Sequence, residues 1–302
     1  MLNAVILATA GFDHKIRFWE PPSGACSRTV RYADSQVNCL RITPDKQYLA
    51  AAGNPHVRLF EVSVPNPNAV VAYDGHTSNV SDLGFQKDGK WMYTGSEDGT
   101  IKIWDVRAPV CQRNYENKAK VHSVALHPNQ AELISGDQLG KVKVWDLTAS
   151  KCRDVAVDSQ DNSIQSITVA TDASYVVAAS SKGRVFVLNP GPANYKLTKQ
   201  FQAHEGYLLK TVLSPNVAHL VTTGSDKSAK VWEVGNDWKL LHTLQQHQRW
   251  VWDAVFSADS SYLVTASSDH TAKLWEVSSG EVLRNYIGHG NSLTCVALND
   301  SK

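Results

Sequence analysis

Four sets of polar side chains recur along this sequence with the residue types of a hydrolytic site. Each set combines a Thr hydroxyl, a His imidazole and an Asp carboxylate, the groups that nucleophilic catalysis uses, with a Trp indole. In three sets the histidine lies 28 residues before the tryptophan, as His76 does before Trp104. The sets are Thr94, Asp98, Trp104 and His76; Thr222, Asp226, Trp232 and His204; Thr265, Asp269, Trp275 and His247; and Thr9, Asp13, Trp19 and His289.

Repetition favours a structural role for these sets. An enzyme needs one nucleophile at one site, whereas four equivalent sets suit a repeated scaffold. An indole N–H can only donate a hydrogen bond, so it needs an acceptor when it is buried. A chain of hydrogen bonds through the four groups would satisfy all of them and fix two loops to each other. We therefore predict four structural tetrads and no catalytic residue.

Other motifs that carry chemistry are absent or incomplete. The stretch 136–141 resembles a phosphate-binding P-loop, but it is one residue short and lacks the final Ser or Thr. The sequence has no HExxH, GxSxG or GxGxxG pattern. Its five cysteines, at positions 26, 39, 111, 152 and 295, show no zinc-ligand spacing. We predict no cofactor, no metal and no enzymatic activity.

The elements that must position the tetrads are short strands in a repeating pattern. Alternating apolar residues, a tight polar turn and an apolar–x–apolar–aromatic stretch recur along the chain, most plainly at 94–105. The anchor residues that end this phrase are Trp19, Phe60, Trp104, Trp145, Leu188, Trp232 and Trp275, at spacings of 41, 44, 41, 43, 44 and 43 residues. Seven repeats of this period predict an all-β, seven-bladed WD-repeat β-propeller with four strands in each blade.

The two ends of the chain should share the closing blade. Trp19 has no marker histidine before it, and the Trp that should follow His289 would lie beyond the last residue. Pairing a strand near 293–298 with strands near 4–10, 15–20 and 26–31 closes the ring without a free sheet edge. The prediction is one propeller domain over 1–302, in which 1–31 and 289–302 form the closing blade.

Three repeats depart from the tetrad pattern. Asn54 and Phe60 replace Asp and Trp in one repeat, Leu139 precedes Gly140 in another, and Lys182 and Leu188 occupy the third. We expect these blades to be held by packing alone and to be locally less stable.

Charge and composition narrow the classes of function. The 30 Lys and Arg against 29 Asp and Glu leave a net charge of +1, which disfavours a nucleic-acid or membrane-surface footprint. No apolar run reaches the roughly eighteen residues that a membrane helix needs. The first ten residues lack the basic start of a secretory signal, and the cysteine usage is typical of reduced thiols. We predict a cytoplasmic protein with protein partners, no nucleic acid, no membrane insertion and no need for self-association.

One face of the propeller should carry the information for recognition. The residues three and five positions after each marker histidine should point to the mouth of the central channel, because side chains alternate along a strand. Most of them are small or polar, but one side of the ring differs. That side holds Tyr207, Leu209, Trp250, Trp252, Thr294 and, from a neighbouring turn, Phe12.

Trp250 and Trp252 admit two interpretations. Val251 and Ala254 already occupy the positions of that strand that point into the protein interior, so both indoles should point toward the channel mouth. The two rings either fill the channel wall or form an apolar patch with the other residues of that side. Apolar patches rimmed by polar residues mark partner surfaces, where Trp and Tyr often dominate the binding energy. We favour the partner surface.

Five stretches of the chain are more distinctive than the general repeat, namely ILATAGFDH at 6–14, DSQVN at 34–38, WMYTG at 91–95, HPNQAELISGDQ at 127–138 and VTASSD at 264–269. Through these stretches the chain resembles a known family, the small WD-repeat subunit of the target-of-rapamycin (TOR) kinase complexes. The stretch at 127–138 lies in a repeat that departs from the tetrad pattern, so general WD-repeat similarity does not explain it. The resemblance spans the whole chain.

The resemblance implies a non-catalytic scaffold subunit that sits on the C-lobe of the TOR kinase domain, near the catalytic cleft. There it would stabilise the active kinase and join other subunits in both TOR assemblies, which control growth in response to nutrients. The side of the ring with Trp250 and Trp252 is then the candidate kinase-facing surface.

Competing classes of function have weaker support. A substrate receptor of a cullin-RING ubiquitin ligase resembles a WD protein with Trp-Asp-x-Arg after a third strand, which Trp104, Asp105 and Arg107 match. A G-protein β subunit resembles a propeller preceded by a helical segment, whereas the first strand here is expected near residue 4. An enzyme ranks last, because no constellation occurs only once.

Overall fold

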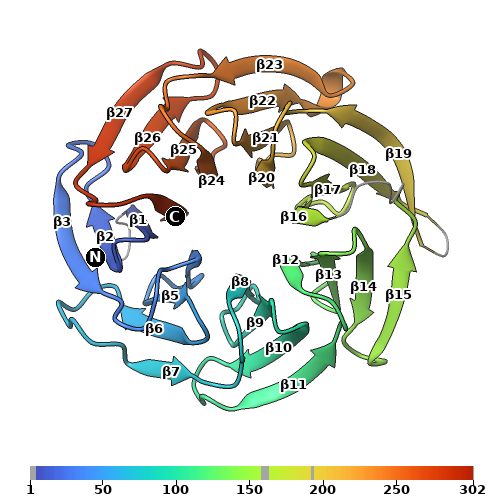
Figure 1. The fold of residues 1–302 in the computed structure, drawn as a ribbon, viewed down its shortest axis with the longest axis horizontal. Coiled ribbons are helices and arrows are strands. Elements are labelled where there is room, and N and C mark those ends of the chain that lie inside the picture. The colour runs from blue at the N-terminus through green and yellow to red at the C-terminus, as the bar shows by residue number, and fades with distance from the viewer. Residues whose placement is uncertain (1–4, 158–162, 192–193, 302) are drawn as a thin grey trace.

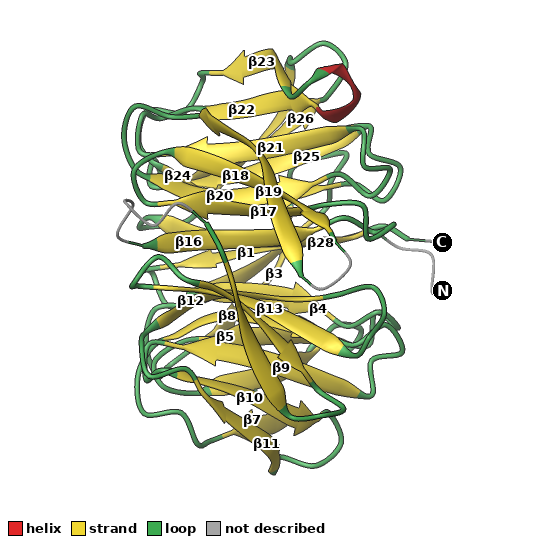
Figure 2. Cartoon of the chain, turned by 90° about the vertical axis from the view of Figure 1, so that its right-hand side faces the viewer, coloured by secondary structure: helices red, strands yellow, loops and turns green. Residues whose placement is uncertain are grey.

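Seven four-stranded antiparallel sheets form a ring around a central channel in the computed structural model, which describes residues 5–157, 163–191 and 194–301. Each sheet is one blade, with its inner strand at the channel and its outer strand at the rim (Figure 1). The strands cross the ring from one face to the other, and loops cover both faces (Figure 2). The predicted all-β, seven-bladed propeller is confirmed.

The strands of each blade follow one another outward from the channel. Blade 1 contains β28 (Leu293–Asn299), β1 (Ile6–Gly11), β2 (Lys15–Trp19) and β3 (Cys26–Arg31). Blade 2 contains β4 (Cys39–Ile42), β5 (Tyr48–Ala52), β6 (Val57–Glu61) and β7 (Val71–Tyr73). Blade 3 contains β8 (Val80–Phe85), β9 (Trp91–Ser96), β10 (Thr100–Asp105) and β11 (Cys111–Glu116). Blade 4 contains β12 (Val121–Leu126), β13 (Glu132–Asp137), β14 (Val142–Asp146) and β15 (Lys151–Val155).

Blades 5 to 7 follow the same order. Blade 5 contains β16 (Ile164–Val169), β17 (Val176–Ser180), β18 (Arg184–Pro190) and β19 (Tyr195–Gln202). Blade 6 contains β20 (Leu208–Leu213), β21 (His219–Gly224), β22 (Ala229–Glu233) and β23 (Lys239–Leu244), with the short 3-10 helix η1 (Val234–Asn236) between the last two strands. Blade 7 contains β24 (Val251–Phe256), β25 (Tyr262–Ser267), β26 (Thr271–Glu276) and β27 (Val282–Ile287).

The closing blade joins the two ends of the chain, as the spacing of the tetrads predicts. β28 pairs with β1 in antiparallel register from Ile6 opposite Asn299 to Gly11 opposite Leu293. The last strand thus supplies the inner edge of a blade whose other three strands come from the start of the chain (Figure 1). Hydrogen bonds along this ladder hold the ring closed.

The hydrophobic core lies between blades. Seven clusters of buried side chains each join two neighbouring sheets. Between blades 2 and 3, for example, fully buried Trp104 and Met92 pack with Leu59 and Tyr73. Each sheet is apolar on both faces because each is covered on both, and burial of such large side chains contributes about 1.5–3 kcal/mol apiece.

Within the described residues, no helix has the length and apolar character that a membrane span requires.

Candidate partner-binding site

The four predicted tetrads are brought together by the fold, each as a chain of three hydrogen bonds. In blade 3, the Trp104 Nε1–H donates to Thr94 Oγ1 at 2.9 Å, and Thr94 Oγ1 lies 2.7 Å from His76 Nε2. His76 Nδ1 then lies 2.7 Å from Asp98 Oδ2. The same contacts occur at 2.7–3.0 Å for Trp19, Thr9, His289 and Asp13, for Trp232, Thr222, His204 and Asp226, and for Trp275, Thr265, His247 and Asp269.

A neutral imidazole satisfies every group in this chain. The indole can only donate and the carboxylate can only accept, so the Thr hydroxyl donates to Nε2 and the Nδ1–H donates to Asp. In blade 1, burial lowers the pKa of His289, although Asp13 opposes the shift. Burial disfavours ionised Asp226, but hydrogen bonds from His204 and Ser228 outweigh burial and lower its pKa to about 2. The buried tetrads hold the turn before the third strand against the loop that enters the blade.

Packing alone does not hold blade 4, contrary to the expectation from its missing tetrad. Asn117, which stands 28 residues before Trp145, donates from Nδ2 to Asp137 Oδ2 at 3.1 Å. The Trp145 Nε1–H donates to Ser135 Oγ at 2.8 Å, and Asp137 Oδ1 accepts from the backbone amides of Leu139 and Lys141. Asp137, two residues before Leu139, thus replaces the missing Asp of the turn.

Blade 2 also has a polar substitute for its tetrad. Tyr32 stands 28 residues before Phe60, and its hydroxyl donates to the carbonyl of His56 at 2.7 Å. The expectation of packing alone is therefore wrong for this blade as well. In blade 5, the position 28 residues before Leu188 is residue 160, which lies outside the described residues.

A ring of seven side chains lines the mouth of the central channel. Six of them stand five residues after the marker position of their blade, and Asn38 stands six residues after Tyr32. All seven border one hollow of about 290 Å³ that has both polar and apolar walls. They are Asn38, Ser81, His122, Gln165, Leu209, Trp252 and Thr294.

A β-bulge in six of the blades aims these side chains at the channel. The register of the inner strand shifts at this residue, for example between Val251 and Asp253 around Trp252. The other five shifts occur at Ser81, His122, Gln165, Leu209 and Thr294. A bulge adds one unpaired residue to a strand and redirects its side chain, which accounts for the ring.

Three aromatic rings of the predicted surface form a continuous stack beside this hollow. The ring centroids of Trp250 and Trp252 lie 5.7 Å apart, and those of Trp250 and Tyr207 lie 6.0 Å apart. Trp252 borders the hollow together with Leu209, Phe12 and Thr294. Tyr207 and Trp250 stand outside it, with 58% and 40% of their surface exposed. The structure therefore brings all six predicted residues to one side of the channel mouth.

The opposite side of the mouth is polar. Glu97 lies 2.9 Å from Lys120 Nζ and accepts a 3.4 Å hydrogen bond from the Asn79 amide. Burial lowers the pKa of His122, which also borders the hollow. An aromatic side and a charged, amide-bearing side thus face each other, an arrangement that suits a protein surface with apolar anchors and a polar rim.

Two buried carboxylates and two partly buried cations lie in the channel below the mouth. Arg41 Nη2 and Lys210 Nζ lie 3.5 Å and 3.7 Å from the two oxygens of Asp82. Asp253, the residue after Trp252, accepts a 3.0 Å hydrogen bond from the Val296 amide in the next blade. Burial acts to raise the pKa of both carboxyls. At Asp82 the two cations outweigh burial, so its pKa is lowered. At Asp253 burial outweighs the cations, so its pKa is raised.

Asp82 also connects two neighbouring blades. The Asp82 carboxylate accepts hydrogen bonds from Ser123 and Val124 of the next blade, so its role is to join inner strands. Among the described residues, no group of three or more His, Cys, Asp or Glu side chains is placed to hold a metal ion.

Comparison with known proteins agrees with this geometry. The family model described as "WD domain, G-beta repeat" matches residues 24–61, 68–105, 109–146, 195–233 and 238–276. These segments cover most of the chain and end at or just after the anchor residues.

Similarity to individual proteins extends over nearly the whole chain. The target of rapamycin complex subunit LST8 of Saccharomyces cerevisiae is 51% identical, over 98% of this chain and 99% of its own. The target of rapamycin complex subunit wat1 of Schizosaccharomyces pombe is 50% identical, over 99% of this chain and 96% of its own. The LST8 subunit of Mus musculus is 43% identical, over 99% of this chain and 96% of its own.

Proposed function

Since this chain belongs to the LST8 family of target of rapamycin complex subunits, we propose that it is a non-catalytic scaffold that binds and stabilises the kinase domain of TOR. The observation that carries the proposal is the exposed aromatic stack of Tyr207, Trp250 and Trp252 at the channel mouth. We assign this stack, with Leu209, Phe12 and Thr294, to the contact with the kinase C-lobe. The protein acts in the cytoplasm, within complexes that respond to nutrients.

The physical basis of this assignment is the cost of leaving such rings in water. Two large aromatics with 58% and 40% exposure are side by side on a ring whose other exposed apolar residues are mostly aliphatic. Trp and Tyr at the centre of an interface contribute about 2 kcal/mol or more each when a partner covers them. The charged side of the mouth, with Glu97 and Lys120, would then form the rim and set the orientation of the partner.

Affinity purification tests the proposal. The wild-type chain and the Trp250→Ala/Trp252→Ala variant are tagged, purified from cells and compared by mass spectrometry, after thermal unfolding has shown that both are folded. Trp91→Ala is the matched control, because Trp91 begins β9 at the end of blade 3 away from the channel mouth. The proposal requires that the TOR kinase is retained by the wild type and the control and lost by the double variant. Equal retention by all three would remove the aromatic stack from the kinase contact.

The substrate-receptor alternative gains no specific support. Trp104 is fully buried in its tetrad, and Asp105 Oδ1 accepts a 2.7 Å hydrogen bond from the Arg107 amide. Two of the three motif residues thus serve the structure of the blade itself. In the same purification, this alternative requires a cullin-RING adaptor in place of the kinase.

A further inference from the structure

A basic side chain recurs at one position of the outer strands. On the outer strand it lies opposite the third-strand residue that precedes the anchor. Arg113, for example, lies opposite Ile103, which precedes Trp104. The other members are Arg28, Arg153, Lys199, His242 and Arg284. In blade 2, Val71 takes this position.

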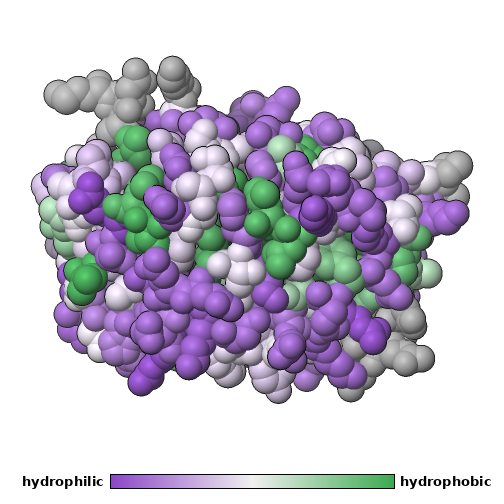
Figure 3. Space-filling view, turned by 90° about the horizontal axis from the view of Figure 1, so that it is seen from above, coloured by the Kyte–Doolittle hydropathy of each residue, from purple (hydrophilic) through white to green (hydrophobic). Residues whose placement is uncertain are grey.

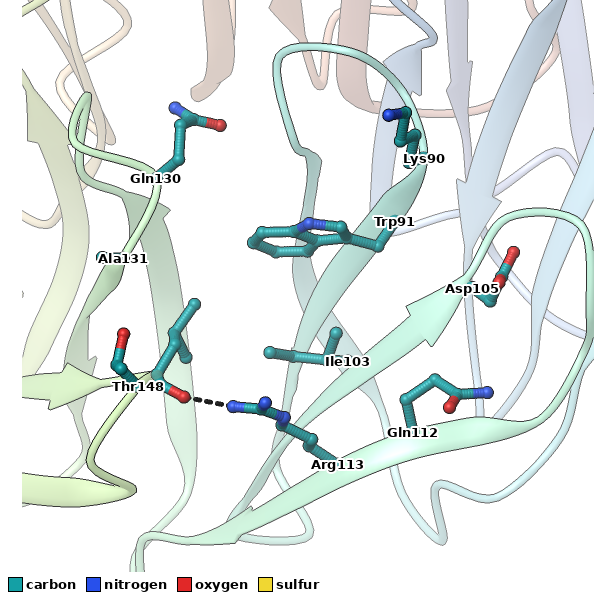
Figure 4. Close-up of a pocket in the computed structure, with 10 residues that line it drawn as sticks. Lys90, Trp91, Ile103, Asp105, Gln112, Arg113, Gln130, Ala131 and Thr148 are labelled. Carbon is teal, nitrogen blue, oxygen red and sulfur yellow. Dashed lines mark hydrogen bonds between the residues drawn. The ribbon is translucent and has the colours of Figure 1, made fainter.

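Five of these six side chains bind the loop after the third strand of the next blade. Arg113 donates from Nη1 to the carbonyl of Leu147, as the dashed line in Figure 4 shows. Arg28 binds the carbonyl of Val62 at 3.3 Å, and Lys199 binds that of Asp237 at 2.6 Å. His242 lies 3.1 Å from the carbonyl of Ser278, and Arg153 lies 3.4 Å from Asn194 Oδ1. The five side chains therefore act as clamps between successive blades.

Arg284, on β27 of blade 7, is the exception. The corresponding loop of the next blade follows Trp19 and carries Pro21 and Pro22. Among the described residues, the Arg284 guanidinium has no hydrogen-bond or salt-bridge partner in this loop or elsewhere. Arg284 borders a groove of about 370 Å³ between blades 7 and 1, at the seam where the ring closes.

The junction between blades 5 and 6 shows how such a groove is filled. There the indole of Trp238 packs on Tyr175 with the ring centroids 5.3 Å apart and on Phe201 at 6.5 Å. The carboxylate of the preceding residue, Asp237, lies 2.5 Å from Lys199 Nζ. An Asp–Trp pair from the next blade thus places its ring against two aromatics and its carboxylate on the clamp cation.

The seam groove repeats the wall positions of that filled groove, although the next blade covers Tyr286 at its base, where the Pro21 carbonyl accepts a 3.1 Å hydrogen bond from the Tyr286 hydroxyl. Strand register makes Arg284 equivalent to Lys199 and Tyr286 equivalent to Phe201. Tyr262 stands 13 residues before its anchor, as Tyr175 does. Val264 and Leu274, paired with each other, correspond to Val177 and Val187 around Trp238. Five wall positions therefore match.

We infer that the seam groove is a second docking site, which takes an acidic residue followed by an aromatic one from a loop of a partner protein. The aromatic ring lies against Tyr262 and Leu274, and the acidic side chain binds Arg284. Tyr262 is 39% exposed and neighbouring Leu283 is 45% exposed, so the wall is open to a partner. Figure 3 shows apolar surface interrupting the polar rim that carries β23 and β27.

Charge in the groove favours this orientation of the occupant. The two carboxylates that also border it, Asp259 and Asp300, already accept hydrogen bonds from Ser257 Oγ and the Ala258 amide. They repel an acid, whereas Arg284 offers free donors in a fork that suits a carboxylate. The acidic side chain of the occupant therefore binds at Arg284.

The seam groove and the aromatic stack can be occupied together. The two tryptophans of the stack lie at the end of blade 7 where Val251 pairs with Ser267. Tyr262, which borders the seam groove, pairs with Glu276 at the opposite end of β25. The second site is thus independent of the proposed kinase contact.

The probe for this site is a capped hexapeptide that copies residues 235–240, Gly-Asn-Asp-Trp-Lys-Leu, with 5-fluorotryptophan. Fluorine NMR of the peptide is recorded while the wild-type protein is added, and then with two variants in its place. Arg284→Glu reverses the charge at an exposed position of the groove. Arg249→Glu is the matched control, an exposed arginine beside the channel mouth.

The wild type and the control should broaden the fluorine signal equally, and Arg284→Glu should weaken binding at least about tenfold. A peptide with Asn in place of Asp should lose affinity for the wild type to a similar extent. No binding up to about 1 mM peptide, the weak limit of specific affinity, would overturn the inference. Binding that Arg284→Glu leaves unchanged would also overturn it.

Discussion

The Trp252 Nε1–H donates a 2.6 Å hydrogen bond to Ser268 Oγ, across the turn between β25 and β26. The Ser268 amide also donates to the carbonyl of Trp250 at 2.9 Å. One serine therefore holds both tryptophans of the channel mouth in place. A fixed ring loses little side-chain entropy when a partner binds, which favours a role in recognition.

We expect Ser268→Ala to release the Trp252 ring. The free energy of unfolding should fall by about 1 kcal/mol, the net value of one hydrogen bond, as measured by urea unfolding. Retention of the TOR kinase in affinity purification should fall as well, because the ring is no longer oriented. Ser268→Thr keeps the hydroxyl and should restore both. If kinase retention is unchanged in a Ser268→Ala protein, orientation of Trp252 does not contribute to the contact.

The tetrads should contribute more to stability than their substitute in blade 4. Thr94→Val leaves Trp104 Nε1 and His76 Nε2 without a partner and should lower the free energy of unfolding by about 2–4 kcal/mol. Ser135→Ala removes the acceptor of Trp145 alone and should cost about 1–2 kcal/mol. Urea unfolding of the two variants compares them. Equal losses would mean that the histidine bond adds nothing.

Stability should fall on acidification through the tetrad of blade 1. The pKa of His289 is lowered by burial, so below pH 6.5 the unfolded chain takes up a proton that the folded protein does not. This contribution is present above that pH and is lost as pH falls toward the lowered pKa. The pKa of Asp13 is also lowered, since its hydrogen bonds outweigh burial, so its contribution is lost below about pH 3.8.

His289→Gln tests this pH dependence. The variant is less stable at pH 7, but between pH 7 and pH 5 its free energy of unfolding should fall less steeply than that of the wild type. Chemical unfolding at a series of pH values measures both slopes. Parallel curves would show that His289 does not titrate differently in the folded and unfolded states.

The two buried carboxyls of the channel should respond differently to loss of charge. Asp82 binds Arg41 and Lys210, and its pKa is lowered because these cations outweigh burial. Asp82→Asn takes the buried carboxylate from two partly buried cations and should cost about 3 kcal/mol, the lower end of the range for a buried pair because the cations keep some contact with water.

Asp253→Asn is the matched substitution. The pKa of Asp253 is raised by burial, so its charged form is less favourable in the folded protein than in the unfolded chain at pH 7. Removing that charge should therefore cost much less than Asp82→Asn, as thermal and urea unfolding can compare. A larger loss for Asp253→Asn would contradict the assignment of the cations to Asp82.

Spacing predicted the ring and the tetrads because both are repeated. Seven anchors at a nearly constant interval, and His289 left without a Trp after it, suffice for the seven blades and the shared closing blade. The same count of 28 residues also leads to Asn117 and Tyr32, whose side chains can hydrogen-bond in place of histidine. Identical residue types alone do not reveal this role, because Asn and Tyr differ from His in size and in donor geometry.

The alternation of side chains along a strand does not by itself predict which residues line the channel mouth. The β-bulge at Trp252 adds a residue to one strand, and whether a strand bulges depends on the register of its neighbour rather than on its own pattern. Nor does local sequence reveal that Trp238 fills a groove whereas Arg284 borders an open one. That difference arises from the loops of the following blades, Asp237 and Trp238 in one and Pro21 and Pro22 in the other.

Hydrogen exchange of the purified chain, alone and in complex with the TOR kinase, tests the central claim most directly. The account predicts that binding protects the backbone amides at 207–209 and 250–252, and leaves those at 89–91 on the opposite face unchanged. Protection confined to the opposite face, or absent from the channel mouth, would contradict the assignment of the aromatic stack to the kinase.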